Sequence, residues 1–312
     1  MKASVEWLKE YSKIDVDAVK LGDILTMAGQ KVETIDQTGN DIKNVVVGKI
    51  LKIEKHQDSD HLVITQVDVG TEKLQIVTGA SKGIGKEIAK KLAKKGNTII
   101  ANYNKSEKEI KELQKELEKQ NIKIDIFQAD ISKREEAKKI VNYTIQKYGK
   151  IDVLINNAGI SQIKEFTQIT DQDWNNMINT NLNSVFYMTQ EACFNMIHNK
   201  QGCIINISSI WGITGASCEV HYSVSKAGVD ALTKSLAKEL GPSNIRINSI
   251  APGIINTEMN SHLTPEELEE LKEEIPLEKI GKTQDIERCV EWLIEDEYTT
   301  GQIISINGGW NI

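Results

Sequence analysis

Thr78-Gly79-Ala80-Ser81-Lys82-Gly83-Ile84-Gly85 is the stretch that decides the fold of most of this 312-residue chain. It follows an apolar, strand-like run at 74–77 and precedes a helical pattern over 86–95. A glycine-rich turn in this context binds the pyrophosphate of a dinucleotide, because glycines let the backbone approach closely and the helix N-terminus offers unpaired N–H groups. Without the strand and the helix, the same glycines would indicate only a tight turn. The predicted cofactor contacts in this loop are Gly79, Ser81, Lys82, Gly83, Ile84 and Gly85.

From residue 74 onward, strand-like apolar runs alternate with helical patterns. This alternation predicts an α/β fold of the Rossmann type, in which helices cover both faces of a doubly wound parallel sheet. The charged run 107–120 carries apolar residues at helical spacing and is interpreted as a solvated helix. Thr264-Pro265 followed by glutamates predicts the start of another helix. The seven expected strands are 74–77, 98–103, 122–128, 151–155, 203–208, 245–250 and 302–306.

Composition and charge exclude several classes of protein. Hydrophobic residues make up 39% and charged residues 27% of the chain, and no apolar run approaches the roughly 18 residues of a membrane span. Because the start also lacks an apolar leader, we expect a cytoplasmic protein without a membrane partner. The net charge of −7 argues against a nucleic-acid surface. The cysteines show neither paired nor metal-type spacing, so we expect reduced thiols and no metal; they are Cys193, Cys203, Cys218 and Cys289.

Tyr222-Ser223-Val224-Ser225-Lys226 places a tyrosine and a lysine one helical turn apart on the same face. An unperturbed tyrosine has a pKa of about 10, and a neighbouring ammonium group eases its proton transfer near neutrality. Ser209 lies at the end of an apolar strand, where its hydroxyl can polarise a carbonyl group. A Tyr-x-x-x-Lys pair alone is more often two exposed side chains on a helix surface without a catalytic role. The glycine-rich loop and Ser209 at compatible spacings favour catalysis instead.

These motifs resemble those of the short-chain dehydrogenase/reductase family, whose Gly-x-x-x-Gly-x-Gly spacing the loop shares, and the resemblance covers 72–312. It implies an NAD(P)(H)-dependent oxidoreductase in which Tyr222 is the general acid, Lys226 binds the nicotinamide ribose and Asn181 holds a relay water. It also implies a homo-oligomer, a tetramer or a dimer. The implied catalytic residues are Asn181, Ser209, Tyr222 and Lys226. The further implied cofactor contacts are Asp130, Ile131, Asn157, Ala158, Gly159, Tyr222, Lys226, Pro252, Gly253 and Thr257.

The end of the second expected strand bears on the choice between NADPH and NADH. A site for NAD needs a carboxylate there to bind the ribose 2′-hydroxyl, and this chain reads Asn104-Lys105-Ser106 instead. Lys105, together with Lys82 of the glycine-rich loop, would attract a 2′-phosphate. We therefore expect NADPH or NADP as the cofactor and contacts from Asn104, Lys105 and Ser106. The alternative is that both lysines are ordinary surface residues.

The substrate is predicted less sharply than the reaction. In length, in the Thr214-Gly215 turn and in the ending Asn307-Gly308-Gly309, the chain resembles 3-oxoacyl-acyl carrier protein reductases. Acyl carrier protein is acidic, so the basic Lys200 suits it, whereas the glutamate-rich helix expected over 266–274 would repel it. The substrate is therefore expected to be a small-molecule, thioester or protein-attached ketone.

A narrower resemblance concerns the run from Ser208 to Val220. It is similar to reductases that convert 5-aminopentanone, attached to a lysine of elongation factor P, into the pentanol. Glu219 lies three residues before Tyr222 and would pair with the amine of that substrate. The alternative is a glutamate that faces solvent.

The first 70 residues form a second part, predicted to be a small α+β segment with helices near 5–11 and 21–28 and strands near 45–55 and 62–69. The segment resembles the N-terminus of the bacterial phenylalanyl-tRNA synthetase β subunit, in Ser4 to Tyr11, Leu25 to Gly29 and Val46 to Leu62. The resemblance runs to about Ala80 and implies a fusion joined at the glycine-rich loop. We place the domain boundary between 1–70 and 71–312.

The resemblance implies the start of a tRNA-binding OB-fold. This barrel would be cut off after its first strands, and a five-stranded barrel cannot close from two or three. We therefore expect only a partial OB-fold and no tRNA binding, although a tRNA-binding module is the rival reading. His56 and His61 with Asp58 and Asp60 are interpreted as a surface loop rather than a metal site.

A third hypothesis for the function of the chain is an oxidoreductase disabled by its fusion. Catalysis should survive, because the first strand of the sheet is entered from the end opposite the cofactor.

Overall fold

The computed structural model describes residues 5–30, 32–33, 35, 49–55, 63–68, 73–261 and 263–311. The chain divides into two compact units, Met1–Gly70 and Thr71–Ile312. None of the helices in the described part of the chain combines the length and the apolarity that a membrane crossing needs. The same residues hold no cluster of histidine, cysteine and acidic side chains that could bind a metal ion.

The larger unit is built on a parallel sheet of seven strands, as predicted. The order is β5-β4-β3-β6-β7-β8-β9, so β3, the first strand of this unit, lies inside the sheet. The strand order reverses between β3 and β6, and in open α/β sheets ligands bind at the carboxyl ends of the strands at this switch point. The strands are β3 Leu74–Val77, β4 Thr98–Tyr103, β5 Asp125–Gln128, β6 Val153–Asn156, β7 Gly202–Ile207, β8 Ile245–Pro252 and β9 Ile303–Ile306.

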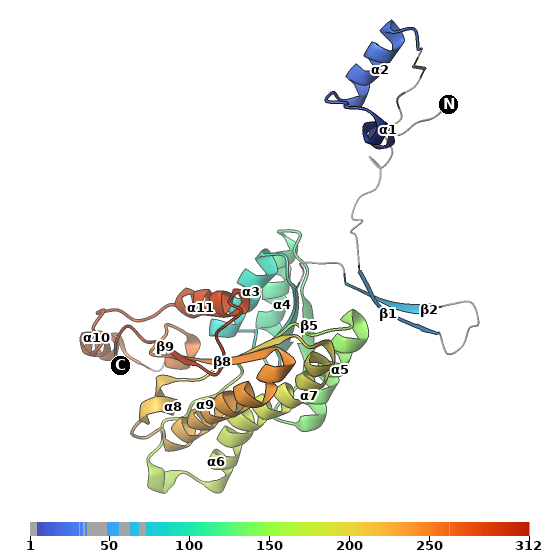
Figure 1. The fold of residues 1–312 in the computed structure, drawn as a ribbon. Helices are drawn as coiled ribbons and strands as arrows, with labels where there is room; N and C mark the ends of the chain where they lie inside the picture. The colour runs from blue at the N-terminus through green and yellow to red at the C-terminus, as the bar shows by residue number, and fades with distance from the viewer. Residues whose placement is uncertain are drawn as a thin grey trace. The chain divides into compact units, whose positions relative to one another are not determined.

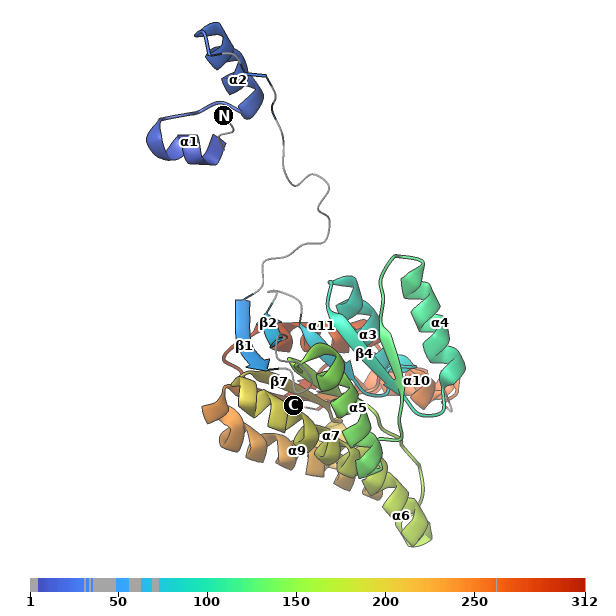
Figure 2. The ribbon, with the colours of Figure 1, turned by 90° about the vertical axis from the view of Figure 1, so that its right-hand side faces the viewer.

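Helices cover both faces of the sheet (Figures 1 and 2). Each face buries its own apolar cluster: Ile88, Leu113 and Leu293 belong to one, and Ile140 and Met188 belong to the other. One face carries α3 Gly83–Lys94, α4 Glu107–Glu118 and α11 Thr283–Glu295, and the other carries α5 Arg134–Tyr148, α7 Ser184–Asn199 and α9 Val220–Leu240. The doubly wound architecture predicted from the alternating pattern is confirmed.

The helix α4 shows how the pattern produces the structure. Ile110, Leu113 and Leu117 are fully buried, while the charged residues between them face solvent. Burying such a side chain contributes about 1.5–3 kcal/mol. The next strand starts later than predicted, at Asp125, because the amide of Ile122 donates to the carbonyl of Leu117 (3.0 Å) and closes the end of α4.

Shorter elements complete the unit. The predicted helix after Thr264 is present as α10 Pro265–Glu274, and Thr264 and Glu267 form a capping box at its start. The remaining elements are η1 Phe166–Gln168, α6 Asp171–Ile178, η2 Asn179–Asn183, α8 Ile210–Thr214, η3 Gly241–Ser243 and η4 Glu258–Asn260.

The smaller unit holds two helices and a pair of strands among its described residues. The helices are α1 Val5–Tyr11 and α2 Ala18–Met27, and Asp17 caps the second by accepting from the amide of Lys20 (2.9 Å). The strands β1 Lys49–Lys55 and β2 Val63–Asp68 pair antiparallel. The loop with His56, Asp58, Asp60 and His61, and the residues 45–48 of the expected first strand, lie outside the described residues.

Candidate active site

Tyr222 and Lys226 lie in the first turns of α9, where this helix crosses the carboxyl end of β7. Both side chains are buried, at 8% and 5% exposed. The Lys226 Nζ donates to the backbone carbonyl of Ile207 (2.8 Å), at the end of β7, and lies 5.7 Å from the centre of the Tyr222 ring. Ser209 follows the same strand and begins α8, and its Oγ accepts from the amide of Trp211 (3.2 Å). The three predicted side chains therefore converge.

Burial dominates the electrostatics of this pair. It raises the pKa of Tyr222 to about 12, against a hydrogen bond with Ser209 that lowers it. Burial likewise lowers the pKa of Lys226 to about 8, against the carboxylate of Asp230 that raises it. Burial is therefore the largest influence on the Tyr222 hydroxyl, and it opposes the easier proton transfer that we expected from Lys226. Tyr222 is a protonated hydroxyl at neutral pH, which is the form a proton donor needs.

The shifted pKa of Lys226 predicts a pH dependence of cofactor capture. Raising the pH through about 8 removes the charge of Lys226 in the free enzyme, and with it the ammonium group that would hold the nicotinamide ribose. We expect kcat/KM for the cofactor, which reports the free enzyme, to fall by about tenfold per pH unit above this value. Initial rates between pH 6 and 10 measure it, and a flat profile up to pH 10 would contradict the assignment.

Asn181 reaches the site through an irregular helical turn. It is fully buried in η2, a π-helical turn between α6 and α7, and such turns occur frequently at functional sites. Its side chain donates to and accepts from the backbone of Ile160 (both 2.8 Å) and donates to Ser225 Oγ (3.2 Å). A Cβ at Gly159 would lie 3.4 Å from both Asn181 Oδ1 and Lys226 Nζ. The amide of Asn181 therefore fixes the loop after β6 beside Lys226.

The glycine-rich loop interlocks with the loop after β6 at the switch point of the sheet. Thr78 Oγ1 accepts from the amides of Asn157 (2.9 Å) and Ala158 (3.1 Å). A Cβ at Gly79, whose φ is +60°, would lie 2.9 Å from the Ala158 Cα, and one at Gly85 would lie 2.4 Å from the Gly79 carbonyl oxygen. Only glycine leaves this cradle open.

The cradle fits the pyrophosphate of a dinucleotide. Within the described part of the chain, no side chain caps the N-terminus of α3, which begins in the glycine-rich loop. Its amide groups and its helix dipole are directed at the place where a phosphate would bind. Gly83 adjoins Thr257, since a Cβ there would lie 3.5 Å from the Thr257 Cγ2. The predicted loops after β3, β6 and β8 thus meet at one end of the sheet.

The residues predicted for the adenosine end lie at the ends of β4 and β5. Asn104 and Lys105 are exposed, and Ser106 precedes α4. Asp130 Oδ1 accepts from the Ser132 hydroxyl (2.6 Å), and Ile131 is buried. Lys105 makes no ion pair with any described residue.

Lys82 departs from the prediction. The sequence indicates an uncommitted cation for a 2′-phosphate, but the Lys82 Nζ lies 2.9 Å from Glu109 Oε1 and 2.9 Å from Glu258 Oε2. Both hydrogen bonds raise the pKa of Lys82 to about 12. The two carboxylates come from segments remote from the glycine-rich loop in the sequence, so no local pattern reveals them.

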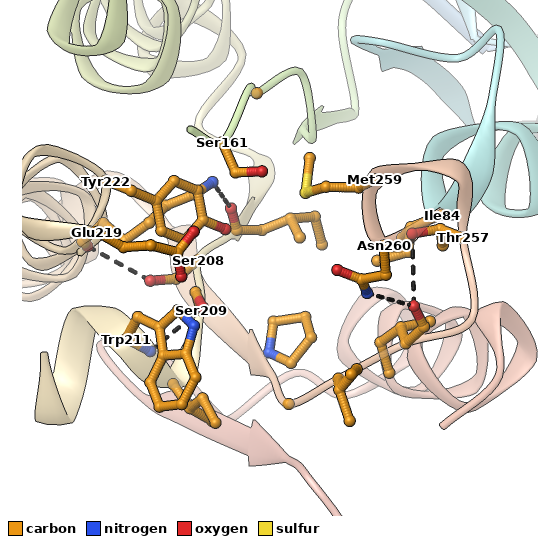
Figure 3. Close-up of a pocket in the computed structure, with 18 of the residues that line it drawn as sticks. Ile84, Ser161, Ser208, Ser209, Trp211, Glu219, Tyr222, Thr257, Met259 and Asn260 are labelled. Atoms are coloured by element: carbon orange, nitrogen blue, oxygen red, sulfur yellow. Dashed lines mark hydrogen bonds between the residues drawn. The ribbon is translucent and has the colours of Figure 1, made fainter. Parts of the chain in front are cut away.

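A cavity of about 270 Å³ opens in front of Tyr222 and Ser209 (Figure 3). Tyr222, Ser209 and Glu219 stand on one side of it, and Thr257 and Asn260 stand on the other. The predicted residues that line it are Ile84, Asn157, Gly159, Ser209, Glu219, Tyr222, Lys226, Pro252, Gly253 and Thr257. Glu219 is half-buried in this wall, which favours the substrate-facing reading over the solvent-facing one.

Two tryptophans that were not predicted from the sequence form an aromatic wall of the cavity. Trp211 and Trp310 pack edge to face with their ring centres 5.1 Å apart, and Trp310 Nε1 donates to Glu274 of α10 (3.2 Å). Trp211 lies two residues after Ser209, a proximity that was a usable signal. Trp310 comes from the C-terminal segment, and only the fold brings it here.

The part of the chain that contains this site matches a known protein family. Residues 73–268 match the family model of short chain dehydrogenases. The chain belongs to this family. An uncharacterized oxidoreductase, YmfI, of Bacillus subtilis (strain 168) is 38% identical over 242 residues, which are 77% of this chain and 99% of the relative.

Two further relatives carry a named activity. The 3-oxoacyl-[acyl-carrier-protein] reductases FabG of Buchnera aphidicola and Thermotoga maritima are 39% and 40% identical, over 77% and 76% of this chain and 97% of each relative. As a short-chain dehydrogenase/reductase, the chain is an oxidoreductase that acts on alcohol and carbonyl groups, and members of this family bind nicotinamide cofactors. Its glycine cradle and uncapped helix fit such a cofactor.

Proposed function

We propose that the larger unit reduces the ketone of a 3-oxoacyl thioester to a secondary alcohol with NADPH. The observation that carries the proposal is that Tyr222, Ser209 and Lys226 line one cavity with the loops expected to hold the nicotinamide. The FabG relatives support the choice of a 3-oxoacyl substrate. Lys105 at the end of β4, where an NAD site would need a carboxylate, supports NADPH.

In this proposal each side chain has its own task. When bound, the cofactor supplies the hydride that adds to the carbonyl carbon. Ser209 donates a hydrogen bond to the carbonyl oxygen, and Tyr222 transfers its hydroxyl proton to the same oxygen as negative charge develops. Lys226 holds the nicotinamide ribose and keeps a positive charge beside Tyr222. Asn181 positions the loop around Gly159.

A direct test compares two ketone substrates. NADPH oxidation at 340 nm is measured with a 3-oxoacyl thioester and with a 5-amino-ketone, and we expect faster turnover of the thioester. Tyr222→Phe serves as the control for background oxidation. Tight NADPH binding without turnover of either ketone would overturn the proposed substrate and leave the cofactor assignment standing.

The second candidate activity is reduction of an amino-ketone, and the position of Glu219 favours it. The carboxylate lies in the cavity wall on the same side as Tyr222 (Figure 3). The acidic α10 also borders the cavity through Leu271, which would disfavour docking of an acidic carrier protein. A protein-attached 5-aminopentanone, as on elongation factor P, would place its ammonium group against Glu219.

Glu219→Gln separates the two candidates. If Glu219 pairs with the amine, the variant lowers kcat/KM for the amino-ketone by about tenfold or more, because a charge-assisted hydrogen bond is lost. The value for an uncharged ketone of the same length stays within about twofold. Equal losses on both ketones would exclude the pairing and return Glu219 to a structural role.

The smaller unit is not part of the proposed activity. The two FabG relatives are matched over 97% of their own length by 77% and 76% of this chain, which supports a reaction that does not need the remainder. The likeness of residues 1–80 to a phenylalanyl-tRNA synthetase β subunit stays a prediction, as does the homo-oligomer. We propose no tRNA partner, because the chain is acidic and the described strands of this unit form only one antiparallel pair.

A further inference from the structure

Lys82 joins three segments that surround the expected path of the cofactor. It belongs to the glycine-rich loop, and its ammonium group bonds Glu109 and Glu258 at the same distance, 2.9 Å. Glu109 lies in the first turn of α4, directly after the predicted adenosine contacts 104–106. Glu258 begins η4, directly after Thr257. We call these three side chains the Lys82 clamp.

The charges of the clamp should affect the two nicotinamide cofactors differently. NADPH carries a 2′-phosphate on its adenosine ribose, whereas NADH carries a neutral hydroxyl there. The two carboxylates engage two of the three N–H donors of Lys82. A phosphate that binds the third donor, or displaces one carboxylate, lies close to a remaining carboxylate, so like charges meet. A hydroxyl neither needs Lys82 nor is repelled by Glu109. The pyrophosphate is common to both cofactors, so the carboxylates act against NADPH more than against NADH.

We propose that Glu109 and Glu258 determine cofactor selectivity, by competing with the adenosine 2′-phosphate for Lys82. The proposal rests on the proposed function only in taking the glycine-rich loop as the cofactor site. The clamp restrains the preference for NADPH that the cations at 82 and 105 would otherwise give. Discrimination between the cofactors is then set by repulsive groups as well as by attractive ones.

The expected change in NADPH affinity follows from the solvent exposure of the clamp side chains. The side chains of Lys82 and Glu258 are 38% and 68% exposed, so water screens their attraction. Exposed ion pairs of this kind change an equilibrium by about two- to fivefold each. Removing both carboxylates should therefore strengthen NADPH binding by about tenfold. Removing Lys82 should weaken it by about tenfold or more, since a charged contact with phosphate is lost.

Equilibrium binding tests the clamp without any ketone. The full chain is titrated with NADPH and with NADH, followed by cofactor fluorescence, for the wild type, Glu109→Gln, Glu258→Gln and the double variant. We expect the ratio of the two dissociation constants to shift toward NADPH by two- to fivefold in each single variant. Glu107→Gln is the matched control, because Glu107 lies in the same turn of α4 and pairs with Lys111 instead.

The role of Lys82 is tested in the same assay. In a Lys82→Met background, Glu109→Gln and Glu258→Gln should no longer shift the ratio of the dissociation constants toward NADPH. The ammonium group for which the carboxylates and the 2′-phosphate compete is then gone. A gain that persists without Lys82, or one that equals the effect of Glu107→Gln, would overturn the clamp. These outcomes do not depend on turnover, so a chain that binds both cofactors yet reduces no ketone refutes the proposed function and not the clamp.

Discussion

The Tyr222→Phe variant is expected to lose about 10²- to 10⁴-fold in kcat for ketone reduction, the range that a positioned general acid contributes. The substitution removes one oxygen and leaves the ring in place, and that ring is only 8% exposed. The pKa of Tyr222, raised to about 12 by burial, keeps the proton on the hydroxyl until the carbonyl oxygen gains charge. Without this proton the developing alkoxide is not neutralised inside the cavity. Stopped-flow or steady-state oxidation of NADPH gives the value.

A matched variant shows whether the loss comes from the chemistry. Tyr143 also carries a hydroxyl engaged inside the fold, donating to Asp125 Oδ2 (2.8 Å) between α5 and β5. Tyr143→Phe therefore removes the same group away from the cavity and should leave kcat within about twofold while lowering the melting temperature slightly. Tyr222→Phe should change the dissociation constant for NADPH far less than it changes kcat, because the ring and Lys226 remain. If it kept a tenth or more of the activity, Tyr222 would not be the proton donor.

The strands of the sheet could be predicted from the sequence because each is a buried apolar run between helical patterns. The runs at 74–77 and 98–103 became β3 and β4 without change. The run at 122–128 lost its first three residues because the chain needed Ile122 to satisfy the last carbonyls of α4. Where a helix ends and the next strand starts depends on hydrogen bonds between the two elements. The spacing of apolar residues alone does not predict these bonds.

The site also contains residues that the sequence predicted and residues that it did not. Tyr222 and Lys226 are one helical turn apart, so their convergence was implicit in their spacing, and Ser209 was placed by the end of a strand. The π-helical turn that delivers Asn181 has no signature among the residues 179–183. Trp310 and the carboxylates at Lys82 come from remote parts of the chain. Contacts of this kind follow from the packing of the elements and not from any local pattern.

Gly85→Ala is expected to weaken cofactor binding strongly by adding a single methyl group. A Cβ at this position would lie 2.4 Å from the carbonyl oxygen of Gly79 and 2.4 Å from the Asn157 Nδ2. The carbonyl of Gly79 is backbone of the same glycine-rich loop, so this loop must open, and the Asn157 side chain of the loop after β6 must move away. The amide groups at the start of α3 then no longer converge on the pyrophosphate. We expect the dissociation constant for NADPH to rise by about a hundredfold, as the loss of two charge-assisted hydrogen bonds would give.

The same methyl group should also destabilise the fold. Overpacking of a tight contact costs about 1–3 kcal/mol, so the melting temperature falls even without cofactor. Gly241→Ala is the control, because no described atom outside its immediate surroundings lies within 4 Å of the added Cβ and the backbone there is helical. The two variants are compared by thermal unfolding with and without NADPH. Bound cofactor raises the melting temperature of a protein that binds it, so at the same NADPH concentration the rise should persist in Gly241→Ala and be much smaller in Gly85→Ala. An equal rise in both would mean that the loops at the switch point do not hold the cofactor.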